Sequence, residues 1–227
     1  HQVRAVSYSR SPSAATVERL KTAGIVCIPT VGAKRHAVKA VEMGADAVVI
    51  QGGEGGGHTG SVATSILLPQ VRDAIDVPIA AAGGFRDGRG LVAALAMGAD
   101  GIAMGTRFLL TQESPVPEAT KLIYLRTPPE KIVVSTRLDG LPQRMIANAY
   151  LDRLIRASQL GLLVRAVKNG LAFSRMTGGS LMATLGGAWK MYRSGDLSFG
   201  QTLMAANSPM MIPVSYTHLR AHETDIN

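Results

Sequence analysis

One short turn sequence occurs twice and constrains the fold more than any other feature of the chain. Residues 44–47 read Gly-Ala-Asp-Ala and residues 98–101 read Gly-Ala-Asp-Gly, and each follows a helical pattern and precedes an apolar run. Glycine can end a helix in the left-handed conformation, and aspartate can bond to the backbone of a turn. The same helix-to-strand connection is therefore expected twice, which is typical of a repeated strand–helix unit.

Short apolar runs alternate with helical patterns along the first half of the chain. The runs are rich in Val, Ile and Ala on both faces, as in parallel strands that helices cover on both sides. This alternation predicts an α/β fold with a parallel sheet, either part of a barrel or an open doubly wound sheet. We expect strands at 3–8, 25–29, 47–51, 77–82 and 101–104, and helices at about 13–23, 33–43, 66–74 and 87–97.

The pattern changes after residue 110, where prolines interrupt the chain and helical patterns return only over 151–173 and in short segments near 189–191 and 201–206. We expect residues 1–125 to form the strand–helix part and residues 126–213 a helical extension. Residues 214–227 break the preceding pattern and are similar to translated adapter read-through, so we interpret them as a non-native tail and exclude them from fold reasoning.

The composition limits the classes of partner. Hydrophobic residues make up 46% of the chain and charged residues 18%, which is enough apolar material for a core. The net charge of +8 indicates a basic face or an affinity for phosphates, but the basic residues are scattered and aromatics are only 4%, so no nucleic-acid partner is expected. Without a signal peptide or a membrane-spanning run, we expect a cytoplasmic protein. Cys27, the single cysteine, is interpreted as a buried core residue, and no metal site is expected.

The densest chemical signal is the loop after the third expected strand, Gln51-Gly52-Gly53-Glu54-Gly55-Gly56-Gly57-His58-Thr59-Gly60. Glycines let a backbone approach a ligand closely and adopt positive φ. His58 follows a strand end, and histidine is the side chain whose unperturbed pKa lies near neutrality, so it can act as a general acid or base. The alternative is a loop histidine that bonds to a backbone carbonyl.

Two further strand ends carry donors for an anion. Gly83 and Gly84 follow the fourth strand, with Asp87 as the expected N-cap of the next helix, and Gly105 and Thr106 follow the fifth. In (β/α)8 barrels a phosphate site lies after strands seven and eight. On that basis the chain would hold about the last five βα units of a TIM barrel, and about three units would precede His1.

These motifs together resemble the nitronate monooxygenase (2-nitropropane dioxygenase-like) family, whose members are FMN-dependent (β/α)8 barrels. The resemblance covers about residues 1–125 and is carried by 44–52, 57–60, 81–84 and 104–108. It implies that His58 is the catalytic histidine. It also implies that the flavin contacts Gln51, Gly52, Gly57, Gly83, Gly84, Gly105 and Thr106.

One departure from the family pattern points to a particular branch. The family usually has Glu-Ala-Gly before the Gly-His pair, whereas this chain has Glu-Gly-Gly at 54–56. Together with residues 136–142 and 203–210, this variant is similar to an actinobacterial branch that includes a flavin reductase of a steroid-degradation CoA thioester. This second match extends to about residue 213.

The resemblance implies an FMN-dependent oxidoreductase that oxidises alkyl nitronates with dioxygen. The first alternative is an NAD(P)H-dependent flavin reductase of an unsaturated acyl-CoA thioester. The second is a non-catalytic barrel that binds a phosphorylated ligand. In each case the partner is a small molecule, and a homo-oligomer is left open.

Overall fold

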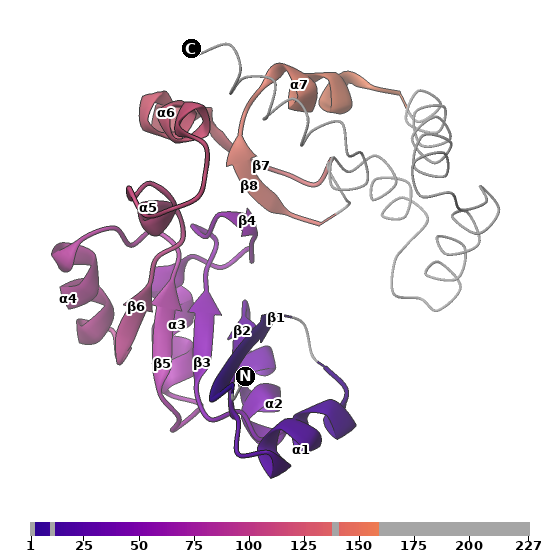
Figure 1. Ribbon diagram of the computed structural model, residues 1–227, viewed down its shortest axis with the longest axis vertical. Coiled ribbons are helices and arrows are strands. Elements are labelled where there is room, and N and C mark those ends of the chain that lie inside the picture. Colours follow the sequence, from indigo (N-terminus) through magenta and orange to yellow (C-terminus); the bar gives the residue numbers. More distant parts are fainter. Residues whose placement is uncertain (1–2, 10–11, 138–140, 159–227) are drawn as a thin grey trace. The chain divides into compact units, whose positions relative to one another are not determined.

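The computed structural model describes residues 3–9, 12–137 and 141–158 (Figure 1). The chain divides into two compact units, the first ending at Thr111 and the second beginning at Gln112. Each unit is described by itself.

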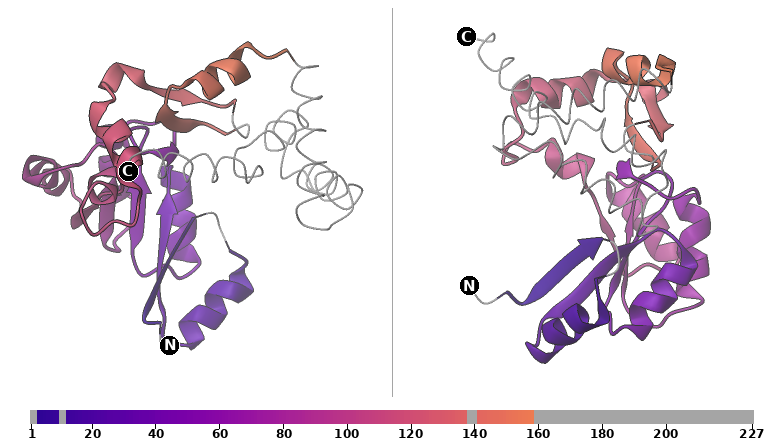
Figure 2. Two further views of the ribbon diagram at one scale, coloured as in Figure 1. Left: turned by 45° about the horizontal axis from the view of Figure 1, so that its top comes forward. Right: turned by 90° about the vertical axis from the view of Figure 1, so that its right-hand side faces the viewer.

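A parallel sheet forms the centre of the first unit. Its strands are paired in the order β1–β2–β3–β5–β6, which follows the chain without a reversal. Because crossovers between parallel strands are right-handed, an unreversed order places every connecting helix on the same face, as Figure 2 shows. The described sheet is therefore singly wound, and the doubly wound alternative does not apply to it. The strands are β1 (Ala5–Ser9), β2 (Val26–Val31), β3 (Val48–Gln51), β5 (Ile79–Ala82) and β6 (Gly101–Ala103).

The helices of this unit begin and end where the sequence indicates. Each of the five strands and four longer helices lies within two residues of its expected bounds. Ser13 accepts from the Thr16 N–H at 3.2 Å and Asp87 from the Arg89 N–H at 3.1 Å, as expected of N-caps. The helices are α1 (Ala14–Thr22), α2 (Lys34–Glu42), α3 (Thr64–Arg72), α4 (Gly88–Ala96) and the short α5 (Thr106–Leu109); β4 (Gly57–His58) is a two-residue strand.

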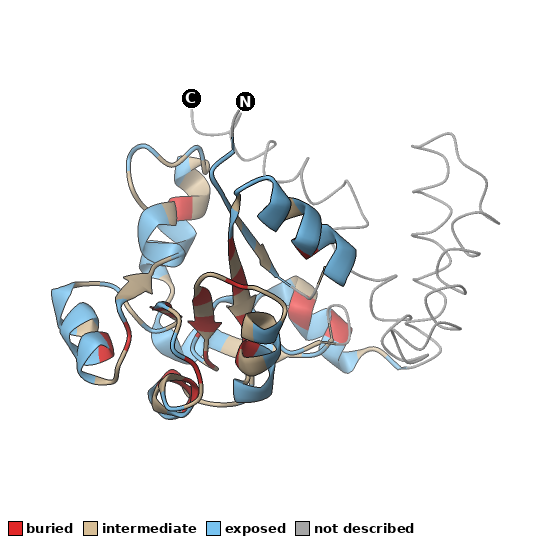
Figure 3. Cartoon of the chain, turned by 90° about the horizontal axis from the view of Figure 1, so that it is seen from below, coloured by how far each residue is buried: buried red, intermediate tan, exposed pale blue. Residues whose placement is uncertain are grey.

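The core lies between the sheet and its helices (Figure 3). Alternate residues of the central strands face the helices and are buried, while their neighbours on the other face, such as Ile28, Val49 and Ala80, are only partly buried. The sequence predicted helices on both faces, and this prediction was wrong for the described residues. Cys27 is fully buried, as expected. The core includes Val31, Val48, Ile50, Leu67, Leu68, Val71, Ile79 and Ala81.

The repeated Gly-Ala-Asp turns join the amino ends of neighbouring strands. Gly44 and Gly98 adopt φ of +93° and +97° after their helices. Asp46 donates its N–H to Cys27 O at 2.9 Å and accepts from Cys27 N–H through its carboxylate at 2.8 Å. Asp100 makes the same pair of bonds to Ile79, at 2.8 Å each. The aspartates therefore reach the preceding strand of the sheet, whereas the sequence predicted a bond to their own turn.

Asp46→Asn is expected to lower the stability of the protein near neutral pH by about 1–2 kcal/mol, because it weakens a charge-assisted bond to the Cys27 N–H and an ion pair with Lys21. The Cys27 N–H and Lys21 hold the pKa of the Asp46 carboxyl below its usual value. The ionised form therefore stabilises the fold above the unfolded pKa of about 4, and this contribution is lost as the pH falls through the folded pKa.

Thermal unfolding from pH 7 down to pH 3 checks this expectation. The difference between wild type and Asp46→Asn should be largest at neutral pH and should shrink below about pH 4. Asp76→Asn, which removes the same charge from an exposed loop position, is the matched control. A difference that is constant over this pH range would contradict the assignment.

The second unit contains two strands that the sequence did not predict. A helix, α6 (Glu118–Arg126), is followed by a 3-10 turn (Pro129–Lys131) and by β7 (Ile132–Ser135) and β8 (Gln143–Ile146), which pair antiparallel. The last described helix, α7 (Ala149–Arg156), begins at Asn148, whose side chain accepts from the N–H of Tyr150 and Leu151. It confirms the start of the helix expected over 151–173, and Ala157 ends it in an extended conformation.

The expected segments near 189–191 and 201–206, and the expected tail from residue 214, lie outside the described residues. Within the part of the chain that is described, no helix has both the length and the apolar character needed to cross a membrane.

Candidate functional site

Three loops lie at the carboxyl ends of neighbouring parallel strands. The glycine loop, residues 51–60, follows β3, the Gly83–Gly84 turn follows β5, and Gly105–Thr106 follows β6. Since β3, β5 and β6 are adjacent and parallel, their carboxyl ends share one edge of the sheet. The sequence therefore placed all three loops on the correct edge.

Close backbone approach brings these loops together. Gly83 has a φ of +95°, and a methyl group at this position would lie only 2.7 Å from the Gly55 nitrogen. A methyl group on Gly56 would lie 4.0 Å from Thr106 Oγ1. The middle of the glycine loop thus packs against Gly83, an approach that requires the absence of a side chain, and it lies near Thr106.

Gln51 supports the glycine loop from within. Its Nε2 donates to His58 O at 2.7 Å and to Gly56 O at 3.4 Å. A methyl group on Gly55 would lie 2.4 Å from Gln51 Nε2, so Gly55 has no room for one. The resemblance assigned Gln51 to ligand contact, which stays a prediction; the structure adds a role in holding the loop that carries His58.

Replacing Gln51 by Glu is expected to loosen the glycine loop, because a carboxylate would face two carbonyl oxygens without a proton to donate. Losing the bond to His58 O should destabilise the loop by about 1–3 kcal/mol. Amide hydrogen exchange over residues 52–60 should then speed up, while exchange in α1, which does not contact the loop through any bond described above, stays unchanged. Gln70→Glu, at an exposed position of α3, is the control. Equal exchange in the two variants would contradict this role of Gln51.

Glu54 makes a contact that the sequence analysis missed. Its Oε2 accepts from both the N–H and the Oγ1 of Thr64, each at 2.7 Å, at the first residue of α3. The N-cap residue of that helix is Ala63, whose side chain cannot cap. The sequence did offer one signal for this contact, because the helix start has no capping side chain and an acidic residue precedes it. A spacing of ten residues, however, is too long for local capping patterns to reveal.

Gly52 also packs closely against Thr64. A methyl group on Gly52 would lie 2.3 Å from Thr64 Oγ1 and 2.5 Å from its Cα, and both residues are buried. Thr59 Oγ1 donates to Gly52 O at 2.9 Å, closing the base of the loop. Packing alone therefore explains why residue 52 is glycine, and its predicted contact with a ligand remains a prediction.

His58 itself lies in β4 and is exposed, directly after Gly57 with its φ of +72°. Gly105 and Thr106 are exposed as well, and no atom lies within 4 Å of a methyl group placed on Gly105. Asp87 serves as the cap of α4; the Arg89 guanidinium bonds to it at 2.6 Å and lowers the pKa of its carboxyl. The exposed residues at this edge thus include a histidine, a threonine and glycines, together with the charged residues Glu54, Arg86 and Arg107.

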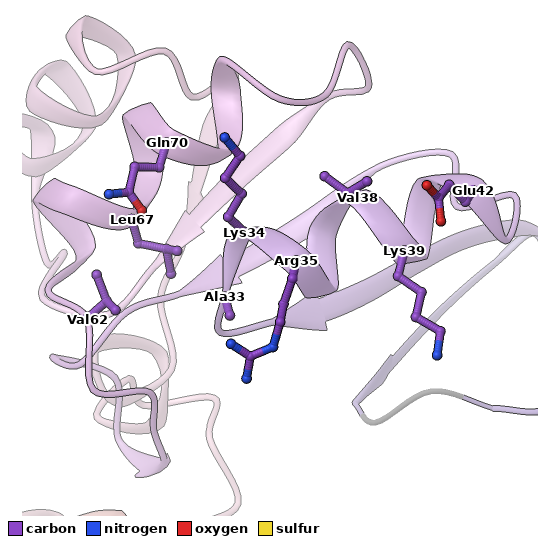
Figure 4. A pocket seen from close by; sticks show the side chains of 9 residues that line it. All are labelled: Ala33, Lys34, Arg35, Val38, Lys39, Glu42, Val62, Leu67 and Gln70. Carbon is purple, nitrogen blue, oxygen red and sulfur yellow. The ribbon is translucent and has the colours of Figure 1, made fainter.

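A groove of about 640 Å³ lies elsewhere on the first unit, between α2 and α3 (Figure 4). Its floor includes Val38, Val62 and Leu67, and Lys34, Arg35 and Lys39 extend from α2 around it. None of the site residues expected from the sequence lines it. We therefore assign the candidate site to the loop edge of the sheet and not to this groove.

These features define a singly wound α/β protein whose glycine-rich loops meet at one edge of a parallel sheet. The chain belongs to the nitronate monooxygenase family, whose profile matches residues 1–202. The family expected from the sequence motifs is thus confirmed.

Individual relatives agree with this assignment. Over 220 residues the chain is 46% identical to the (3aS,4S,5R,7aS)-5-hydroxy-7a-methyl-1-oxo-octahydro-1H-indene-4-carboxyl-CoA dehydrogenase of Rhodococcus jostii, covering 97% of this chain and 62% of that protein. The chain therefore spans less than two thirds of this relative.

Two solved structures are similar in fold. FabK from Thermotoga maritima superposes with a TM-score of 0.63 at 26% identity, covering 96% of this chain and 70% of that one. Nitroalkane oxidase from Streptomyces ansochromogenes gives a TM-score of 0.59 at 27% identity, covering 99% and 66%.

Proposed function

We propose that this protein is an FMN-dependent oxidoreductase of the nitronate monooxygenase type, which oxidises alkyl nitronates with dioxygen. The observation that carries the proposal is the meeting of three glycine-rich loops at the carboxyl edge of a parallel sheet, with His58 in the largest of them. Membership of the nitronate monooxygenase family supports it. The single buried cysteine is compatible with a reducing cytoplasm as the location.

We further propose that the described sheet is part of a (β/α)8 barrel, formed by residues 1–125, with residues 126–213 as an extension. The unreversed strand order supports this, because a barrel is wound in one direction. The partly buried apolar face around Ile28, Val49 and Ala80 also fits, because that face would line the inside of a closed barrel.

The residues at the loop edge suit a flavin phosphate. Gly83 and Gly84, at φ of +95° and +84°, present backbone without side chains, and the Thr106 hydroxyl can donate to an anion. These groups and Gly105 would hold the phosphate, while Gln51, Gly52 and Gly57 would border the rest of the cofactor. When bound, FMN would accept electrons from the substrate and pass them to dioxygen.

The role proposed for His58 is proton handling and orientation. An imidazole at an exposed loop position can take the proton from the carbon next to a nitro group, or hold a nitronate oxygen by donating to it. Because Gln51 anchors the backbone carbonyl of His58, the ring is attached to a supported segment.

A second candidate is an oxidoreductase acting on a CoA thioester. The 46% identity to a protein named as a carboxyl-CoA dehydrogenase favours it. That name describes removal of hydrogen, whereas the motif resemblance suggested an NAD(P)H-dependent reduction, so both directions need testing.

Anaerobic reduction of the flavin tests both candidates. The full-length protein, reconstituted with FMN, would be followed at about 450 nm, where oxidised flavin absorbs. Bleaching by an alkyl nitronate supports the monooxygenase. Bleaching by NADH or NADPH, or by a saturated acyl-CoA thioester, supports the second candidate. If the protein does not retain FMN, the oxidoreductase proposal fails.

A further inference from the structure

We propose that Glu54 and Thr64 act as a positioning pair that fixes the glycine loop against the start of α3 and against the Gly83–Gly84 turn. The inference rests on the proposed function, since its importance depends on a ligand bound between these loops. Neither residue is assigned a role by the motif resemblance.

The contact between the pair is short and doubly bonded. One carboxylate oxygen of Glu54 accepts from the N–H and from the hydroxyl of Thr64, both at 2.7 Å. Thr64 is only 3% exposed, so its hydroxyl is largely shielded from water. Glu54 is itself an exposed residue, so only the Thr64 side of the contact is shielded. Bonds to an ionised acceptor are about twice as strong as neutral ones.

The charge of Glu54 suits its position. The first turn of a helix carries N–H groups without partners and a partial positive charge, and Ala63 offers no capping side chain to α3. The glycine loop thus supplies the acidic cap that the helix lacks. Loop and helix therefore stabilise each other through Glu54 and Thr64, which are ten positions apart in the sequence.

The same pair reaches the neighbouring loop. Thr64 Oγ1 lies 3.3 Å from Gly83 O, and a methyl group on Gly84 would lie 3.4 Å from Glu54 Cβ. Gly52 packs against the backbone nitrogen and the hydroxyl oxygen of Thr64. Thr64 is therefore the residue around which the base of the glycine loop, the Glu54 carboxylate and the Gly83 carbonyl are arranged.

This arrangement also controls where a negative charge lies. A carboxylate beside the Gly83–Gly84 turn would repel a phosphate there. The N–H and hydroxyl of Thr64 bind that carboxylate and direct it to the helix. Loss of Thr64 should therefore weaken phosphate binding through a looser loop and a misplaced charge, whereas loss of Glu54 should weaken it through the looser loop alone.

A double-mutant cycle on FMN binding by the full-length protein tests the pair. Glu54→Ala and Thr64→Val should each weaken FMN binding roughly tenfold, about the effect of losing a helix cap. The double variant should be no worse than either single one. Thr64→Ser should restore binding, and Glu54→Gln should restore part of it, because the amide oxygen can accept the same bonds. Glu18→Ala, at an exposed position of α1, is the control.

Hydrogen exchange in the protein without flavin separates this inference from the proposed function. Both Glu54→Ala and Thr64→Val should speed exchange over residues 52–60 and in the first turn of α3. If the wild type binds no FMN, the proposed function fails, while faster exchange in these variants would still support the pair. Unchanged exchange, or additive losses of FMN affinity, would overturn it.

Discussion

The full-length protein carrying His58→Gln is expected to keep its flavin and to lose turnover of a neutral nitroalkane, whose carbon must give up a proton, by a factor of about 10²–10⁴, the usual contribution of a positioned general acid or base. Glutamine can still donate a hydrogen bond but cannot carry a proton between substrate and solvent. The backbone contact from Gln51 is made to the His58 carbonyl, so the substitution leaves the loop in place.

Two measurements give this result its meaning. Flavin absorbance after gel filtration establishes that the cofactor is retained, and steady-state oxidation of the neutral nitroalkane gives the rate. His36→Gln is the control. It removes a histidine at an exposed position of α2, outside the three loops, and should keep the wild-type rate. A His58→Gln variant as fast as the wild type would remove His58 from the mechanism.

Gly83→Ala is expected to produce a large loss of stability, because a methyl group there combines a backbone clash with an unfavourable positive φ. The new methyl group would lie 2.7 Å from the Gly55 nitrogen and 3.1 Å from its Cα, and residue 83 has a φ of +95°, which L-residues rarely adopt. Backbone strain and overpacking each cost about 1–3 kcal/mol, so a loss of roughly 3 kcal/mol or more is expected. Both neighbouring groups are backbone and cannot rotate away.

Thermal unfolding with and without FMN checks this prediction. A loss of 3 kcal/mol corresponds to a fall in Tm of about 6–12 °C for a protein of this size. Gly88→Ala is the matched control, because nothing lies within 4 Å of its methyl group and it begins α4, where alanine is well tolerated. A Gly83→Ala variant as stable as Gly88→Ala would show that the loops do not approach as described.

The strand–helix part of the fold was predictable because its signals are local. Apolar runs mark the strands, Ser13 and Asp87 mark helix starts, and Gly44 and Gly98 mark helix ends. Parallel pairing then brings the carboxyl ends of the strands to one edge, so the sequence pattern alone predicts that the three loops lie together there.

Features that depend on distant partners were not predictable in the same way. The Glu54 cap joins residues ten apart through a loop whose path is set by Gly52 and Gly83. The hairpin of β7 and β8 was missed because Gln143–Ile146 does not alternate cleanly between polar and apolar residues. Ile132–Ser135, which is rich in β-branched residues, was the stronger signal and could have been used.

The two Gly-Ala-Asp turns fasten the amino ends of the strands, whereas the glycine loops occupy the carboxyl ends. Mutational tolerance should therefore differ between the two ends. A library randomised in the loops outside Gln51, Gly52, Glu54, Gly55, Thr64 and Gly83 should still yield soluble variants, because the bonds of Asp46 and Asp100 are untouched. Substitutions in the loops can therefore change substrate preference without disturbing the pairing of the strands.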